Sequence, residues 1–424
     1  MDCLSFVLTG FMIQRDVQLK KIEIEFIMRT QTTAKMFGVV RILILVVLIA
    51  STANSQPQEM RNLLKCEQSS SCTCIEYNEV EIQCPKFEPH VFVRIQSNNY
   101  VHFECENMTG NEYELVPKYQ LDVAAFLQIT KCSLLQGTSI ISSYLKNIQI
   151  DRIRSFQFVS SGANKNTQIE SKHFRGLEGI ERFDLRGLEN EIRELPADLF
   201  VGMEKLSWVR IRVANIVLPA ELFTPLENLE FLELGHNKLQ SLEPGFLRNQ
   251  RKLQQLNLWG NALRNLNKES FRGLDLVKEL DLSANGMESL EPDLLYHLTN
   301  LTDINLSANK FSMLPEGLFA NNRKLKHLRL MDNHVTMETL PSDFLSNLTE
   351  IEKVAIKCDL KKLPEGIFAE SRQIKEIFLA QNSLDDLPEF LLKDQENLVT
   401  LDLADNLISQ LPKQFLSLIH ISEP

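Results

Sequence analysis

The chain has 424 residues, of which 44% are hydrophobic and 24% charged, as in ordinary globular proteins. Fifty-six acidic residues against 45 basic ones give a net charge of −11. This balance argues against nucleic acid or an anionic membrane surface as the main partner. Length alone would allow two or three ordinary domains, so the domain organisation has to be inferred from the elements along the chain.

The first predicted element is a secretory signal peptide at residues 36–55. It begins with a methionine, Arg41 supplies positive charge, and residues 42–50 form an apolar run that is too short to span a bilayer. Small residues follow, so we expect cleavage after Ser55 and export of the chain. Residues 1–35, which precede the signal, are either a long n-region or translated upstream sequence, and they are excluded from the fold.

Four closely spaced cysteines mark the next part, residues 56–135. In an exported chain they predict a disulfide-stapled N-terminal cap, followed by a degenerate first repeat. Three pairings are possible, and the compartment disfavours the alternative of a zinc site, so no metal is expected. The four residues are Cys66, Cys72, Cys74 and Cys84.

Two further cysteines, Cys105 and Cys132, lie in the same part of the chain. The spacing Leu127-x-Ile129-x-x-Cys132-x-Leu134 fits the strand and turn of that degenerate repeat. The pair therefore forms either a third disulfide or two buried thiols.

A repeated motif dominates residues 136–415. Between residues 229 and 330 the pattern Leu-x-x-Leu-x-Leu-x-x-Asn-x-Leu occurs four times, with small changes, at a period of 24 residues. This period and pattern are the signature of a leucine-rich repeat solenoid. The predicted fold class is an α/β leucine-rich repeat solenoid: a curved horseshoe with a parallel β-sheet on the concave face and a disulfide-stapled N-terminal cap.

The asparagine of each repeat follows the strand, where the chain must turn. Its side-chain amide can satisfy backbone groups of its own turn and the next, which would otherwise cost about 1–3 kcal/mol each if buried unpaired. Cys358 falls at this position in a shortened repeat, so we interpret it as a buried ladder residue and not a reactive thiol. The predicted ladder is Asn237, Asn261, Asn285, Asn309, Asn333, Cys358, Asn382 and Asn406.

Strand residues between the inward leucines face the concave surface, which is large enough for a folded protein partner. Both tryptophans fall there, and aromatic side chains are frequent anchors of interfaces. The alternative is that the aromatic residues pack on one another to cover the strands, and that the charged residues form a solvated face. The candidate ligand-binding residues are Trp208, Arg210, Arg212, Phe231, Glu233 and Trp259.

Four sequons for N-glycosylation occur, at Asn107, Asn300, Asn305 and Asn347, and we expect some of them to be occupied in an exported chain. Asn305 lies at a concave strand position, so a glycan there would direct a ligand toward Trp208 and Trp259.

The sequence does not indicate an enzyme. The sequence contains no G-x-S-x-G, H-E-x-x-H, Walker or dinucleotide-binding motif, so we expect no catalytic residues and no cofactors. The last nine residues, 416–424, resemble the translation of a sequencing-library adapter, and we expect the natural chain to continue beyond Phe415.

Several stretches resemble the ectodomains of insect Toll-type receptors, over about Cys66 to Phe415. They are Glu81–Pro85, Ile211–Val213, Leu256–Asn261, Leu301–Asn309, Leu314–Ala320 and Leu330–Asn333. The cap is also similar to the N-terminal caps of extracellular leucine-rich repeat proteins, which implies interleaved pairing of Cys66 with Cys74 and of Cys72 with Cys84.

The Toll-type resemblance implies a single-pass cell-surface receptor. Such a receptor binds a secreted cystine-knot cytokine of the Spätzle type, forms a homodimer on ligand binding and signals in immunity or development. Its transmembrane helix and intracellular TIR domain would lie C-terminal to this sequence, and the fragment by itself would be secreted. The alternative is a cell-adhesion protein or a secreted immune leucine-rich repeat protein that binds other proteins through the concave face.

Overall fold

The computed structural model describes most of the chain from residue 73 onward, and all described residues belong to one compact unit, Leu63–Pro424. Side chains at 73–76, 80–83, 91, 123 and 124 are not described. The described residues are 73–76, 80–83, 91–96, 99–105, 123–132, 134, 141–142, 145, 150, 152–160, 169–187, 192–333, 335–413 and 415.

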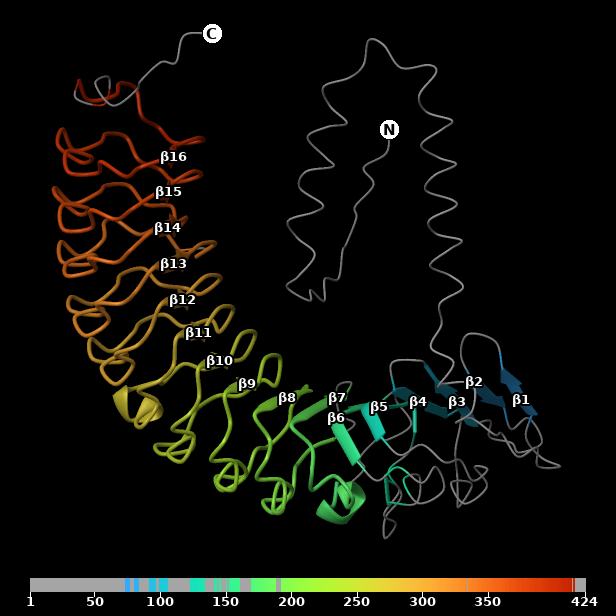
Figure 1. The fold of residues 1–424 in the computed structure, drawn as a ribbon. Coiled ribbons are helices and arrows are strands. Elements are labelled where there is room, and N and C mark those ends of the chain that lie inside the picture. Colours follow the sequence, from blue (N-terminus) through green and yellow to red (C-terminus); the bar gives the residue numbers. More distant parts are fainter. Residues whose placement is uncertain are drawn as a thin grey trace, which may run out of the picture. The chain divides into compact units, whose positions relative to one another are not determined.

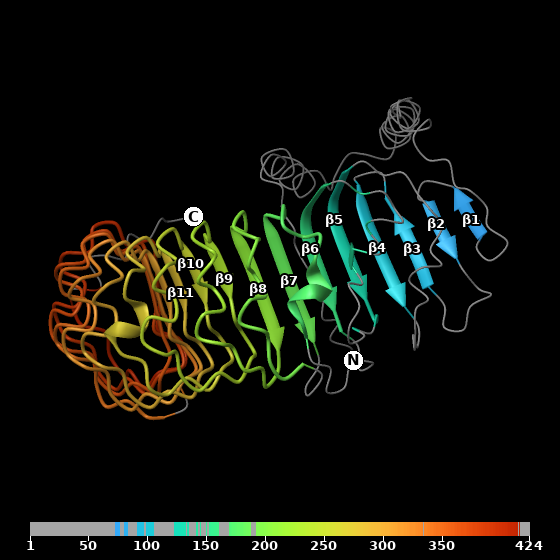
Figure 2. The ribbon, with the colours of Figure 1, turned by 90° about the horizontal axis from the view of Figure 1, so that it is seen from below.

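Sixteen strands form one sheet in which each strand pairs with the next in chain order (Figures 1 and 2). The strands are β1 (Thr73–Glu76), β2 (Val80–Gln83), β3 (Val91–Ile95), β4 (Tyr100–Cys105), β5 (Val123–Thr130), β6 (Arg152–Val159), β7 (Arg182–Gly187), β8 (Trp208–Val213), β9 (Phe231–Glu233), β10 (Gln255–Asn257), β11 (Glu279–Asp281), β12 (Asp303–Asn305), β13 (His327–Leu330), β14 (Lys353–Ile356), β15 (Glu376–Phe378) and β16 (Thr400–Asp402).

From β4 to β16 all pairs are parallel, which confirms the predicted solenoid. The first four strands instead pair antiparallel. The short connections between them cannot carry a chain back for parallel pairing, which needs a crossover of a dozen or more residues. The parallel sheet therefore begins at β4.

Helices are few in this α/β fold. The named elements on the back of the coils are two short 3-10 helices, η3 (Ser171–Phe174) and η4 (Lys268–Phe271), and the rest of the back is mainly turns. Among the described residues, no helix has the length and apolar character needed to cross a bilayer.

Inward-facing leucines and a line of phenylalanines form the core. The strand leucines Leu229, Leu232 and Leu234 are fully buried, as are their counterparts in neighbouring repeats. On the back, Phe200 and Phe223 of successive repeats meet with their ring centroids 6.0 Å apart, and Phe200 also meets the inward-facing Phe183 of β7, with centroids 5.2 Å apart. The strand face opposite this core lies on the inner side of the curve in Figure 1, and we call it the concave face.

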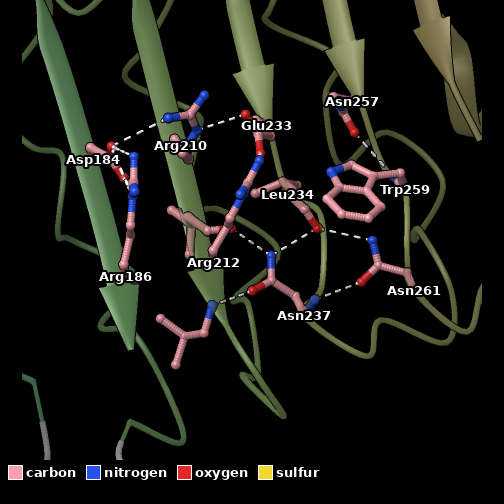
Figure 3. Close-up of polar contacts among 12 residues, drawn as sticks. Asp184, Arg186, Arg210, Arg212, Glu233, Leu234, Asn237, Asn257, Trp259 and Asn261 are labelled. Carbon is pink, nitrogen blue, oxygen red and sulfur yellow. Dashed lines mark hydrogen bonds and ion pairs between the residues drawn. The ribbon is translucent and has the colours of Figure 1, made fainter. Parts of the chain in front are cut away.

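Buried asparagines connect consecutive turns. Asn261 illustrates the pattern: its Oδ1 accepts the N–H groups of Asn237 (3.0 Å) and Leu239 (3.1 Å). Its Nδ2 donates to the carbonyl of Leu234 (2.9 Å; Figure 3) and to that of Leu258 (2.8 Å). Asn237, Asn285, Asn309, Asn382 and Asn406 make equivalent bonds.

The ladder is interrupted where the shortened repeat lies. Cys358 is buried and carries a free thiol, whose sulfur lies 4.0 Å from that of Met337. The preceding ladder residue, Asn333, has a single long bond, from Nδ2 to the Met331 carbonyl (3.5 Å), and its Oδ1 has no partner among the described residues. Loss of one residue from the repeat thus leaves the neighbouring amide poorly paired.

Cys105 and Cys132 form a disulfide across 27 residues, the first of the two predicted alternatives. The cap cysteines Cys66, Cys72 and Cys84 lie outside the described residues, and of Cys74 only the backbone, in β1, is described. The predicted signal peptide, the sequon at Asn107 and the tail 416–424 also lie outside the described residues.

Candidate functional site

Parallel register places concave side chains in rows that run across the strands. The first row starts with two aromatic residues, and the second with a histidine followed by two glutamines. The first row is Tyr100, Phe126, Ser155, Arg182, Trp208, Phe231, Gln255, Glu279, Asp303, His327, Lys353, Glu376 and Thr400. The second is His102, Gln128, Gln157, Asp184, Arg210, Glu233, Asn257, Asp281, Asn305, Arg329, Ala355, Phe378 and Asp402.

The second row forms a continuous chain of side-chain hydrogen bonds from β5 to β7. Gln128 Nε2 donates to Gln157 Oε1 (2.7 Å), and Gln157 Nε2 donates to Asp184 Oδ2 (2.8 Å). Arg186 binds the same carboxylate through two nitrogens, Nε to Oδ1 (3.0 Å) and Nη2 to Oδ2 (2.8 Å). These bonds to Asp184 raise the pKa of the Arg186 guanidinium. Bidentate, partly buried pairs of this kind are among the stronger polar contacts in proteins.

The prediction that Glu233 contacts a ligand is wrong. The strand position of this residue does face the concave side, but the residue is only 2% exposed. Its carboxylate is covered by two arginines: Arg210 Nε donates to Oε2 (2.6 Å), and Arg212 binds Oε1. Glu233 therefore supports the surface from below and holds the two arginines in place (Figure 3).

Trp208 and Phe231 stack on each other. Their ring centroids lie 4.9 Å apart with only 6° between the planes. The Arg210 guanidinium lies 4.7 Å from the Trp208 ring centroid, and that of Arg182 lies 6.0 Å from it. The aromatic residues thus pack on one another, as the alternative interpretation held, yet both remain partly accessible to solvent.

Trp259 lies against a glycine, Gly235, and a histidine, His236. A Cβ on Gly235 would stand 2.5 Å from Trp259 Nε1, so the absence of a side chain there makes room for the indole. The His236 ring meets the indole edge-on at 3.9 Å, while the Arg212 guanidinium lies 5.6 Å from the ring centroid. The Asn257 side chain accepts the backbone N–H of Trp259 (3.1 Å). Trp259 is thereby fixed on the concave face, within reach of Arg212.

We call the surface made by these side chains the arginine–tryptophan patch. Asp184 and Glu233 support it from below. Its members are Arg182, Arg186, Trp208, Arg210, Arg212, Phe231 and Trp259.

The concave face changes character beyond β10. Asp303 and His327 lie 2.5 Å apart, and Lys353 and Glu376 form a 2.6 Å ion pair. These pairs are substantially exposed, and exposed pairs contribute only about 0–1 kcal/mol. They are typical of a solvated face.

Three of the four sequons can be placed. Asn347 is exposed in a turn. Asn300 and Asn305 are half-buried, and in both the glycan-accepting Nδ2 donates a hydrogen bond, to the Asp275 carbonyl (2.7 Å) and to Asp281 Oδ2 (3.2 Å) respectively. Asn305 lies in the second concave row, as expected from its repeat position.

The sequence analysis identified Trp208, Arg210, Arg212, Phe231 and Trp259, which the structure brings together. It missed Gln128, Gln157, Asp184 and Arg186, because the repeats before residue 190 depart from the motif. It also missed Gly235, because the motif does not show that the indole of Trp259, in the next repeat, occupies the space beside that glycine. The Gln157-to-Asp184 spacing of 27 residues, repeat-like but longer than 24, was the available signal. Within the described ranges, no group of three His, Cys, Asp or Glu side chains could hold a metal ion.

Three overlapping segments, residues 216–263, 251–311 and 276–335, match the Leucine rich repeat family. Protein toll of Drosophila melanogaster is 38% identical over 173 residues, which make up 40% of this chain and 15% of that protein. Keratocan of Mus musculus is 43% identical over 82 residues, 18% of this chain and 22% of keratocan. These relatives belong to leucine-rich repeat families that are not enzymes.

Among solved structures, a chain of the Toll–Spatzle complex of Drosophila superposes with a TM-score of 0.75 and 37% identity. The match covers 82% of this chain and 46% of that chain. The chain therefore covers less than half the length of each of these relatives. It has the leucine-rich repeat fold and is similar to Toll in both sequence and structure.

Proposed function

We propose that this chain is the ligand-binding part of a Toll-type receptor and that it binds a Spätzle-like cystine-knot cytokine. The arginine–tryptophan patch is the centre of the proposed interface. Two observations support it: the exposed faces of Trp208, Phe231 and Trp259 are held in fixed positions, and the chain is similar over 82% of its length to a chain solved in complex with Spatzle.

The patch has the residue types that are typical of the centre of a protein interface. Stacked aromatic rings and arginines with fixed guanidinium planes lose little conformational entropy when a partner covers them, and Trp, Tyr and Arg dominate the energy of many interfaces. The patch extends over four strands, β7 to β10, which at about 4.8 Å per strand is roughly 14 Å. This is a suitable size for the core of a protein interface with a polar rim around it.

A glycan on Asn305 would limit where the ligand can bind. Asn305 lies two strands beyond β10, and its Nδ2 lies on the concave face beside Asp281. A bulky glycan at this position would leave the surface toward β7 free, so we propose that the cytokine binds on the N-terminal side of β12. A complex with the cytokine seated over a glycosylated Asn305 would contradict this placement.

Binding of a purified Spätzle-type cytokine to the secreted chain, measured by biolayer interferometry, tests the proposal. Trp208→Ala is expected to weaken binding at least about tenfold, the effect of losing roughly 1.4 kcal/mol or more at an interface centre. Tyr296→Ala is the matched control, because Tyr296 is an exposed aromatic residue (54%) outside the concave rows. Equal loss in both variants, or none in Trp208→Ala, would refute the proposed site.

The proposal extends to a cell-surface receptor that pairs on ligand binding and signals across the membrane in immunity or development. Sedimentation of the secreted chain with and without the cytokine tests the pairing step. We expect a complex with two receptor chains only when the cytokine is present. A complex with a single receptor chain at saturating cytokine would contradict ligand-driven pairing by this part of the receptor.

Similarity to keratocan supports a second candidate, a secreted or adhesive leucine-rich repeat protein that binds other proteins through the concave face. This candidate would be favoured if the chain bound no Spätzle-type cytokine.

A further inference from the structure

The charges of the arginine–tryptophan patch are unequally exposed. Its two carboxylates lie beneath the surface, with side-chain exposures of 8% for Asp184 and 3% for Glu233. The arginines above them are far more accessible, at 40% for Arg186 and 35% for Arg212. A partner approaching the patch therefore meets guanidinium groups, although the whole chain has a net charge of −11.

Several donors of the patch are unused within the part of the chain that the structure describes. The guanidinium of Arg186 binds Asp184 through Nε and Nη2, and that of Arg212 binds Glu233 through the same two atoms. A guanidinium has five N–H donors, so the Nη1 edge of each remains available. The indole N–H of Trp259 likewise has no acceptor among the described residues. The patch offers ring faces and donors, but hardly any acceptors.

Arg182 is the most available of these cations. It is exposed, and among the described residues its only interaction is the 6.0 Å approach to the Trp208 ring. The nearby acids lie at the margin: Glu181 pairs with Arg154 (3.6 Å), and Glu230 precedes β9 and lies outside the two rows. Within the two rows, Asp184 and Glu233 are covered by arginines, and acidic residues without an arginine above them follow only further along, at Glu279, Asp281 and Asp303.

We propose that the partner surface that docks on the arginine–tryptophan patch is acidic, with carboxylates next to an apolar side chain. This inference rests on the proposed function and specifies the chemistry of its ligand at that site. The apolar side chain would lie against Trp208 and Phe231, and the carboxylates would accept from Arg182, Arg186 and Arg212. The acidic residues on β11 and β12 would repel such a segment, so the charge pattern also orients the partner along the concave face.

Charge reversal at Arg182 tests the proposal, because this side chain holds neither supporting carboxylate. With the secreted chain and a purified Spätzle-type cytokine, Arg182→Glu is expected to weaken binding at least about tenfold. Arg182→Lys should retain most of the affinity. Arg251→Glu, at an exposed arginine in a turn outside the rows, controls for the same change in net charge and should bind like the wild type.

Salt dependence provides a second readout. Raising the ionic strength from about 0.05 M to about 0.5 M should weaken wild-type binding, and the loss should be smaller for Arg182→Glu because one attractive contact is already absent. If Arg182→Glu binds the cytokine as tightly as the wild type or more tightly, the inference of an acidic partner surface is overturned, while the proposed function stands. Failure of the wild type to bind the cytokine at all would refute the proposed function, and this inference with it.

Discussion

Two neighbouring parts of the solenoid keep their strands stacked by different means. In the regular part, β9 to β12, each strand has three residues, and buried asparagines join the turns that follow. In the irregular part, β4 to β8, the strands have six to eight residues. There a disulfide, a cluster of phenylalanines and the polar chain from Gln128 to Arg212 provide the connections.

This difference matters for binding. A strand of three residues has only its first and third side chains on the concave face, whereas β8 presents Trp208, Arg210 and Arg212 from one extended segment. Longer strands therefore allow a denser set of interacting side chains. The arginine–tryptophan patch lies where the two parts meet, with arginines from the irregular part and Trp259 from the regular part.

The largest expected effect concerns the core of the irregular part. Phe183 is fully buried and contacts the rings of Phe156, Phe174 and Phe200. Phe183→Ala should lower the free energy of unfolding by about 4 kcal/mol, because it removes a large apolar side chain and leaves a cavity. Urea denaturation measures the loss, with Phe390→Ala as the exposed control (55%). A loss below about 1 kcal/mol would show that this ring cluster does not stabilise the irregular part.

A smaller effect is expected from the ladder of the regular part. Asn285 donates to the carbonyls of Leu258 (3.1 Å) and Leu282 (2.9 Å) and accepts from the N–H of Leu263 (3.2 Å). Asn285→Ala should cost about 2–3 kcal/mol in urea, because these buried backbone groups lose their partners. Asn333→Ala should cost less than about 1 kcal/mol, since Asn333 is already poorly paired. Equal losses would show that the ladder bonds are not what stabilises these turns.

The junction of the two parts can be tested at Gly235. A Cβ there would collide with Trp259 and move the indole, which should destabilise the fold by about 1–2 kcal/mol. The chain has two tryptophans, so in a Trp208→Phe background the emission spectrum reports on Trp259 alone. Gly235→Ala should shift that spectrum. Gly179→Ala, where an added Cβ meets nothing within 4 Å, should leave it unchanged.

The smallest effect concerns Cys358, the ladder position without an amide. Burial, together with the charge of Asp359, raises the pKa of its thiol from 9.0 to about 12. Because the folded-state pKa is the higher one, the stabilisation is fully present below pH 9 and is lost as the pH rises toward 12. Alkylation at about pH 8, followed by peptide mapping, should modify Cys358 only after unfolding. Rapid modification of the folded chain would contradict its burial.

The repeat motif alone predicted most of the regular part. The period of 24 residues gave the parallel sheet, the inward leucines and the positions of the turn asparagines. Cysteine spacing, however, left two alternatives for Cys105 and Cys132, and it gave no sign that β1 to β4 pair antiparallel. Antiparallel pairing depends on connection lengths, which the loosely patterned segment before residue 176 did not reveal.

The concave site could be predicted only in part. A strand position determines the side on which a residue lies, so the sequence correctly placed Trp208, Phe231 and Trp259 on one face. It could not tell that Glu233 is buried beneath Arg210 and Arg212, because burial here depends on side chains contributed by the neighbouring coil.

By itself, the sequence determined the repeat, its direction of stacking and the ladder, because these follow from a local period that each coil carries within it. Only the tertiary structure decided which charges are exposed, which arginines remain available and why Gly235 has no side chain. Those properties arise between coils, where residues 21 to 29 positions apart in the chain compete for the same space and the same hydrogen-bond partners.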